Sequence, residues 1–90
     1  MKFGSTRDLV EAGELAEVRL KVQDGGETIV CRISREALEA LVSRVVSEPG
    51  DLRDIAYHYY EFLTDRWARR IQLGICELDG TVLLRRSDVR

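Results

Sequence analysis

The sequence predicts a small α+β domain in which an antiparallel sheet packs against two helices, in the order β-β-α-α-β. Two segments of alternating apolar and polar residues come first, two longer segments with helical spacing follow, and a β-branched, apolar segment comes last. A chain of 90 residues is typical of one domain. We therefore expect residues 15–90 to form a single α+β domain, and the polar, aperiodic residues 1–14 to form a loose N-terminal arm.

The first two strands are predicted by a period of two. Apolar residues occupy every second position from 16 to 22 and from 29 to 33, with Asp24-Gly25-Gly26 between the two segments. Such alternation indicates half-buried strands. Asp-Gly and Gly-Gly both supply the positive φ angles of a tight hairpin turn. A two-residue loop at 24–25 or at 25–26 keeps one face apolar, so both registers are consistent with the sequence.

A first helix is predicted to begin after Ser34, whose hydroxyl can cap the free backbone N–H groups of the first turn. Ile33 and Leu38 have the spacing of a hydrophobic staple across this helix start. Pro49-Gly50 is predicted to end the helix. Its expected buried stripe consists of Ala37, Leu38, Leu41, Val42, Val45 and Val46.

A second, longer helix is predicted to begin with Asp51 as its N-cap and to end near Gly74. Apolar residues recur in it at steps of three and four, as one helical face requires. The expected face consists of Leu52, Ile55, Ala56, Tyr59, Leu63, Trp67 and Ile71. Residues 75–86 are predicted to form either one strand or a short hairpin around Asp79-Gly80.

Three stretches in this order carry a resemblance to a known family. They are C-R-I-S-R-E-A-L (31–38), A-R-R-I (68–71) and G-I-C-E-L-D-G-T-V-L-L-R-R-S-D (74–88). Together they resemble a family of small bacterial proteins, the domain of unknown function fourteen eighty-eight, over about residues 15–88. The resemblance implies a compact α+β fold. It implies no catalytic residues, because no activity is established for the family.

Composition narrows the classes of function. The formal net charge of −2 is nearly balanced along the chain, which gives little overall support to strong nucleic-acid binding. Apolar runs are far shorter than the roughly 18 residues of a membrane span, and the N-terminus lacks the apolar core of a signal peptide. Two cysteines are too few for a disulfide framework. We therefore expect a cytoplasmic protein without a membrane partner.

Three residues could carry chemistry, but the pattern favours structural roles for each. Cys31 shares a strand face with Ile29 and Ile33, which predicts a buried thiol rather than a reactive one, while its neighbour Arg32 should face solvent. Ser34 is expected to be a helix cap. His58, the only histidine, lacks the further ligands or the nucleophile that a metal or catalytic site needs. We expect no enzyme activity, no metal and no cofactor.

The remaining candidate is a cluster of arginines near the end of the second helix. We predict that these side chains could converge on one patch that contacts an anion or a partner, with Arg90 near them and with Tyr57 and Tyr60 at the border. The patch, called the arginine patch below, consists of Arg66, Arg69, Arg70, Arg85 and Arg86. A solvated face balanced by nearby acids is the plainer interpretation.

Two functions follow from these observations. The first is a non-catalytic protein-interaction module, with a homodimer as one form, because a small sheet leaves edges that a partner can cover. The alternative is a nucleic-acid-linked regulatory protein that uses the arginine patch. The balanced charge disfavours the alternative.

Overall fold

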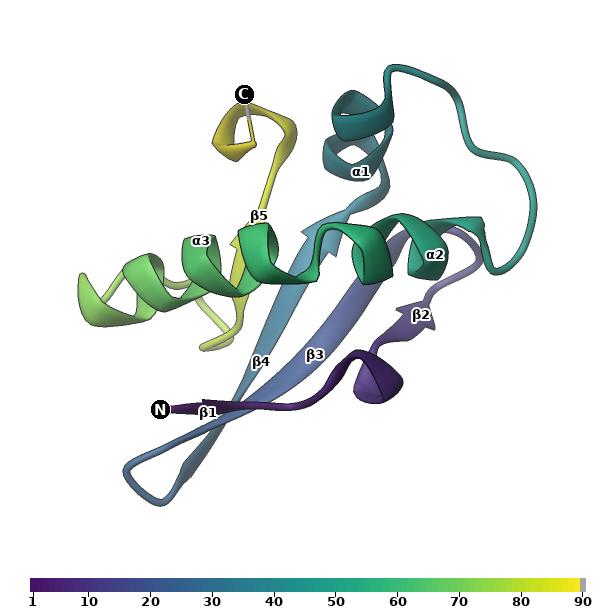
Figure 1. Cartoon of the computed structure of the whole chain (residues 1–90). Coiled ribbons are helices and arrows are strands. Elements are labelled where there is room, and N and C mark those ends of the chain that lie inside the picture. Colours follow the sequence, from purple (N-terminus) through teal and green to yellow (C-terminus); the bar gives the residue numbers. More distant parts are fainter. Residues whose placement is uncertain (90) are drawn as a thin grey trace.

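The computed structural model describes residues 1–89, in which a five-stranded sheet carries three α-helices on one of its faces (Figure 1). The predicted α+β fold is therefore confirmed. The strands are β1 (Lys2–Phe3), β2 (Val10–Ala12), β3 (Glu17–Asp24), β4 (Glu27–Ser34) and β5 (Val82–Leu84). The helices are α1 (Arg35–Val42), α2 (Asp51–His58) and α3 (Tyr60–Gln72), with 3-10 helices η1 (Thr6–Asp8) and η2 (Arg86–Asp88).

The hairpin of β3 and β4 forms the centre of the sheet. Val18 lies opposite Ile33 and Val22 lies opposite Ile29, which is the register of a two-residue loop at Gly25-Gly26. Both glycines have positive φ, 59° and 87°, as this turn requires. The predicted hairpin is confirmed, and the second of its two registers is the one adopted.

The N-terminal segment forms two short strands where the sequence predicts a loose arm over residues 1–14. β1 and β2 both pair with the edge of β3 that β4 leaves free. Strands of two and three residues are too short to show a period of two, so the pattern gave no signal. Tertiary contacts hold them: the Phe3 ring stacks on Trp67 with centroids 6.5 Å apart, and Leu9 is buried.

The first helix is shorter than predicted. α1 ends at Val42, and Ser43 takes the left-handed conformation with φ of 55°, well before Pro49-Gly50. Val45 is 77% exposed rather than buried, whereas Val46 is buried as predicted. The chain turns back after α1 because the Glu39 carboxylate accepts a hydrogen bond from the Val46 backbone N–H at 2.7 Å. The Glu39 side chain therefore ends α1 well before Pro49.

The predicted second helix is interrupted at Tyr59, whose backbone has φ of −103° and ψ of 17°. Its N-cap is Gly50 rather than Asp51, which becomes the first helical residue. The Tyr59 hydroxyl donates to the Leu41 carbonyl oxygen at 3.2 Å, so the interruption is tied to the end of α1. The predicted apolar face is largely buried on both sides of the break, at Leu52, Ile55, Ala56, Leu63 and Trp67.

The last strand is single and runs parallel to β4, with Val82 opposite Cys31 and Leu84 opposite Ile33. The alternative of a second hairpin at 75–86 is wrong. The sheet is mostly antiparallel, as predicted, and the β4–β5 pair is its one parallel pair among residues 1–89. A parallel pair needs a long crossover connection, and the helical segment between β4 and β5 supplies it. The crossover returns the chain alongside β4, so that β5 pairs with residues 31–33.

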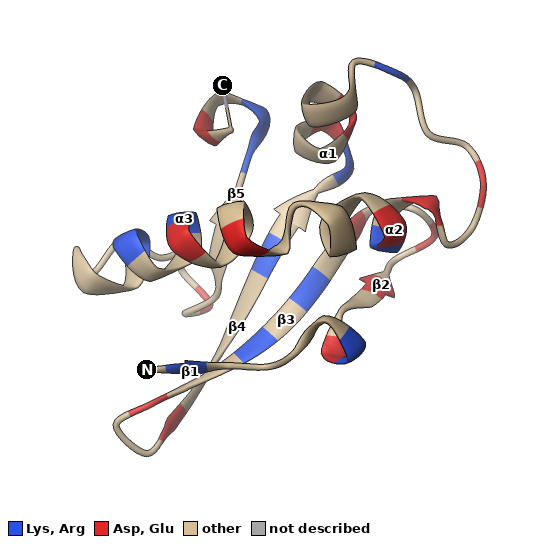
Figure 2. Cartoon of the chain, viewed as in Figure 1, with Lys and Arg blue, Asp and Glu red and all other residues tan. Residues whose placement is uncertain are grey.

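The two faces of the sheet differ in cover and in charge. One face packs against the helices and contributes the core residues Val18, Leu20, Val22, Cys31, Ile33, Val82 and Leu84. The other face, called the open face below, is not covered by a helix of residues 1–89 (Figure 1). Figure 2 shows basic residues along β1, β3 and β4. By register and burial, the open face carries Lys2, Val10, Glu17, Arg19, Lys21, Val30, Arg32 and Leu83.

Candidate functional site

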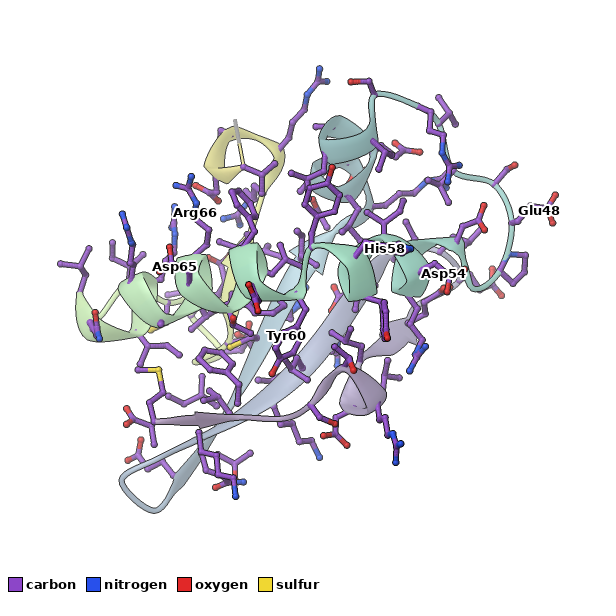
Figure 3. The ribbon with its side chains drawn as sticks, in the orientation of Figure 1. Glu48, Asp54, His58, Tyr60, Asp65 and Arg66 are labelled. Carbon is purple, nitrogen blue, oxygen red and sulfur yellow. The ribbon has the colours of Figure 1, made fainter. Side chains whose placement is uncertain are left out.

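The arginine patch comes from two segments that contact each other. Arg66, Arg69 and Arg70 lie on α3, while Arg85 and Arg86 follow β5, which packs against α3. The structure therefore brings the two segments of the predicted patch together. Arg90 lies outside the described residues. The predicted aromatic border is wrong, because Tyr57 packs edge-on against His58 in α2 and Tyr60 points from α3 toward the N-terminal segment (Figure 3).

Most of these arginines already have a partner within the chain. Arg70 forms an ion pair with Asp88, and the Arg85 guanidinium pairs with Glu77. Arg69 Nε lies 3.4 Å from the nearer carboxylate oxygen of Asp65, and the Arg66 guanidinium carbon lies 4.8 Å from the centre of the Phe62 ring. A guanidinium that holds an internal carboxylate must release it before it can bind another anion. The patch is therefore a poor anion site.

Arg86 differs from the other four members. It is exposed, and it lines a shallow groove between α1 and the C-terminal segment together with Glu36, Glu39 and Arg44. The two glutamates make this groove a mixed surface rather than a cationic one. Arg86 therefore does not extend the patch toward an anion.

Glu17 is buried at one end of the open face. Its Oε1 accepts a hydrogen bond from Arg32 Nη2 at 2.8 Å, and its Oε2 accepts from Arg32 Nε at 2.9 Å and from Arg19 Nε at 2.5 Å. Arg32 also donates to Thr81 Oγ1 at 3.1 Å. The prediction that Arg32 is solvated is wrong, because its side chain is 22% exposed and forms a two-pronged bond to this carboxylate.

This network explains how two arginines can face each other across the hairpin. Arg19 lies directly opposite Arg32, a pairing of like charges that would destabilise the sheet on its own. The hydrogen bond from Arg32 lowers the pKa of Glu17, and the bond from Arg19 acts in the same direction against the opposing effect of burial. The carboxylate therefore stays ionised, and its negative charge offsets the repulsion between the two guanidinium groups.

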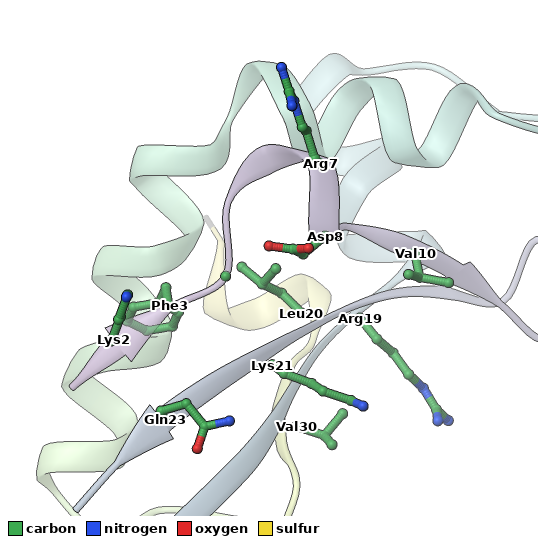
Figure 4. A pocket seen from close by; sticks show the side chains of 11 residues that line it. Lys2, Phe3, Arg7, Asp8, Val10, Arg19, Leu20, Lys21, Gln23 and Val30 are labelled. Atoms are coloured by element: carbon green, nitrogen blue, oxygen red, sulfur yellow. The ribbon is translucent and has the colours of Figure 1, made fainter.

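A hollow of about 690 Å³ occupies the other end of the open face (Figure 4). It forms where the chain between β1 and β2 leaves the sheet, turns through η1 and returns. It is lined by Lys2, Phe3, Gly4, Arg7, Asp8, Val10, Arg19, Leu20, Lys21, Gln23 and Val30. Its volume lies within the range of about 300–1,000 Å³ that is usual for ligand pockets.

The cations of this hollow differ from those of the arginine patch. Within residues 1–89, no carboxylate forms an ion pair with Lys2, Arg7 or Lys21. Asp8, the one acid in the lining, accepts from the backbone N–H of Ser5 at 2.7 Å and is committed to capping η1. The hollow is therefore a basic site with aliphatic walls. Sequence alternation already places Lys21 beside Arg19 on one face, but gave no signal for the other two cations.

The residues considered for chemistry have the structural roles predicted for them. Cys31 is fully buried, and burial raises the pKa of its thiol to about 12. Ser34 Oγ accepts a hydrogen bond from the backbone N–H of Ala37 at 3.1 Å and caps α1. His58 is exposed on α2. Cys31 and Ser34 belong to β4 and His58 belongs to α2, and none of the three lines the hollow.

No group of three or more His, Cys, Asp or Glu side chains within residues 1–89 could hold a metal ion. No helix in the same range has the length and apolar character needed to cross a membrane.

Comparison with known proteins identifies the fold. No family model and no curated protein matches the chain. The structure is similar to a crystal structure of a protein of unknown function from the duf1488 family of Shewanella loihica, with a TM-score of 0.82 and 17% sequence identity. The match covers 92% of this chain and 89% of the other. The predicted resemblance to this family is therefore confirmed in the fold.

Proposed function

We propose that this chain is a non-catalytic protein-interaction module of the bacterial cytoplasm, and that it binds its partner through the open face of the sheet. One observation carries the proposal. The helices cover a single face, while the opposite face presents a preformed hollow with aliphatic walls, lined by Lys2, Arg7 and Lys21, which have no carboxylate partner within residues 1–89. A concave surface with a few directed polar groups is the usual form of a binding site.

The chemistry of the lining supports binding rather than catalysis. The hollow has no cysteine, serine or histidine, and its one carboxylate is engaged in a helix cap. A nucleophile next to a base is the minimum that covalent catalysis requires. The Cys31 thiol does not serve this face as a nucleophile. It is buried in the core, and burial raises its pKa.

The structure gives no independent support to the alternative of a nucleic-acid-linked regulator. That function needs cations free to meet phosphates, and four of the five arginines in the patch are engaged with Asp65, Asp88, Glu77 or the Phe62 ring. The alternative predicts binding to a single-stranded oligonucleotide that weakens on charge reversal at Arg69 and Arg70. Absence of binding at low salt would remove it.

Affinity capture from native bacterial cytosol tests the proposed function. Three baits are compared: the wild-type chain, the double variant Lys2→Glu/Lys21→Glu and the matched double variant Arg66→Glu/Arg69→Glu, each after nuclease treatment. We expect a protein that binds the wild type and the Arg66/Arg69 variant but not the Lys2/Lys21 variant. Equal capture by all three baits, or loss of every partner after nuclease treatment, would contradict the proposal.

Self-association is a separate prediction with its own test. The exposed edges of the sheet at β2 and β5 are each three residues long, and short edge strands limit pairing between copies. Two open faces would also place Lys2, Arg19 and Lys21 of one copy against the same cations of another. Light scattering after size exclusion measures the mass of the protein in solution. A monomer mass at every concentration would exclude the homodimer.

A further inference from the structure

Hydrogen bonds from distant parts of the chain hold the segment that borders the hollow on the open face. The Gly4 backbone N–H donates to the Lys21 carbonyl oxygen at 2.9 Å, and the Tyr60 hydroxyl donates to the Gly4 carbonyl oxygen at 2.5 Å. The Arg53 guanidinium donates to the carbonyl oxygens of Leu9 at 3.0 Å and Thr6 at 3.3 Å. The looped segment is thus fixed at both ends, and a preformed site binds with a smaller entropic cost.

Gly4 shows how closely the loop is packed at its start. A Cβ atom at this position would lie 3.0 Å from Asp8 Oδ2 and 3.1 Å from Leu20 Cδ1. A side chain at this position would require Asp8 or Leu20 to move by a few tenths of an ångström. The Asp8 carboxylate that packs here accepts a hydrogen bond from the Ser5 backbone N–H.

Cations and aliphatic side chains alternate over the hollow. Val10 lies opposite Arg19 in the β2–β3 pair, and Lys21 lies opposite Val30 in the β3–β4 pair. Val10 is 57% exposed, a high value for a valine in a strand. Figure 4 shows Arg19 and Lys21 extending side by side from β3, with Val30 next to Lys21. A ligand that matches this surface carries negative charges and aliphatic groups a short distance apart.

We infer that the hollow binds a segment of a partner protein in which acidic residues flank aliphatic ones. The inference rests on the proposed function and adds the chemistry of the partner. Carboxylates of the segment meet Lys2 and Lys21, while its aliphatic side chains pack on Val10 and Val30.

Two other occupants fit the same surface less well. Nucleic acid without a fixed sequence binds through aromatic rings that stack on bases, and the one ring in this lining, Phe3, is stacked on Trp67 instead. A second copy related by a two-fold axis would bring equal cations together. An acidic segment needs no aromatic ring to stack on, and it places no like charges against the cations of the hollow.

Fluorescence anisotropy with labelled peptides tests the inference on the full chain. The probe is a peptide that alternates Glu and Leu, and its controls are a Glu-Ser peptide and a Lys-Leu peptide of the same length. We expect the Glu-Leu peptide to bind more tightly than both controls and to bind more weakly as salt rises. The variant Lys2→Glu/Lys21→Glu should bind it about tenfold more weakly, while Arg66→Glu/Arg69→Glu should bind it like the wild type.

Four results would overturn the inference. These are no binding of the Glu-Leu peptide, equal binding of the Glu-Ser peptide, unchanged binding by the Lys2/Lys21 variant, and tighter binding of a single-stranded oligonucleotide at the same residues. Circular dichroism of each variant confirms that it is folded before binding is compared. If the captured protein depends on Lys2 and Lys21 but the Glu-Leu peptide fails to displace it, only the inference fails. If no protein is captured, the proposed function fails.

Discussion

The arginine patch and the hollow on the open face both gather cations, but the fold uses them differently. At the end of α3, Arg70 reaches Asp88 and Arg85 reaches Glu77. In the hollow, Lys2 and Lys21 have no carboxylate partner among residues 1–89. The arginine patch is easier to recognise in the sequence, yet carboxylates of the same chain pair with three of its five arginines. A cluster of cations therefore indicates a binding site only after its internal partners are known.

The difference separates two kinds of contribution. Removal of a cation that holds an internal carboxylate should lower the free energy of unfolding and leave binding unchanged. Removal of an unpaired cation should weaken binding and leave the free energy of unfolding nearly unchanged. Measurements of stability and of binding on variants of both kinds can therefore distinguish engaged groups from free ones.

The two cysteines should show this contrast most strongly. Cys31 is buried with a thiol pKa of about 12, against an ordinary value of 9.0, whereas Cys76 is exposed. Near pH 8 the thiolate fraction of Cys31 is lower than that of an ordinary thiol by about a thousandfold. Titration with a chromogenic disulfide should label one thiol per folded chain and two after unfolding. Rapid labelling of Cys31 in the native protein would show that the core at β4 is open.

Loss of Glu17 should have the largest effect on stability among the charged residues. Glu17→Ala leaves the half-buried Arg32 opposite Arg19 without the carboxylate between them. We expect the free energy of unfolding to fall by about 2 kcal/mol, the usual cost of removing hydrogen bonds to a charged group. Urea unfolding followed by Trp67 fluorescence measures it. Glu27→Ala, at an exposed position of β4, is the control and should change little.

The pH dependence of stability gives a second measure of the same carboxylate. The pKa of Glu17 is lower in the folded chain than its ordinary value of 4.5, because Arg32 donates to it. The contribution of Glu17 is therefore fully present above the ordinary pKa and is lost as pH falls through the lowered one. The stability difference between wild type and Glu17→Ala should shrink between about pH 5 and pH 3. A difference that stays constant over this range would contradict the proposed role.

The smallest expected effect compares one engaged and one free cation directly. Arg70→Ala removes the ion pair with Asp88, whose carboxylate also accepts from the Arg85 backbone N–H at 2.7 Å. We expect a loss of about 1 kcal/mol, whereas Lys21→Ala should cost less than about 0.5 kcal/mol. Matched urea titrations measure both. If Lys21→Ala were the more destabilising change, the distinction between engaged and free cations would fail.

Local patterns were sufficient to predict the central hairpin, most of the buried helical faces and the cap at Ser34. Each depends on residues close in sequence: a two-glycine turn, a repeat of three or four, and a hydroxyl three residues before the N–H that it accepts from. The stretch at 31–38 joins the hairpin to α1 as predicted, with Cys31 and Ile33 in the core.

Features that depend on distant residues could not be predicted in the same way. β1 and β2 are held by Trp67, Tyr60 and Arg53, which lie more than forty residues away. The engagement of Arg32 depends on Glu17, which pairs with it only because the hairpin brings both to the open face. Of the hollow, the alternation in β3 indicated only Lys21 and Arg19. The loop that completes the hollow has no pattern of its own.

The parallel pairing of β5 with β4 has a consequence for the order in which the molecule assembles. The strands of the hairpin meet across a loop of two residues, but Val82 must find Cys31 across about fifty. Closing so long a loop carries a larger entropic cost, which only the docked helices can offset. The C-terminal strand should therefore join last, and its substitutions should accelerate unfolding with little effect on the folding rate. β5 thus completes a sheet whose other strands have already folded.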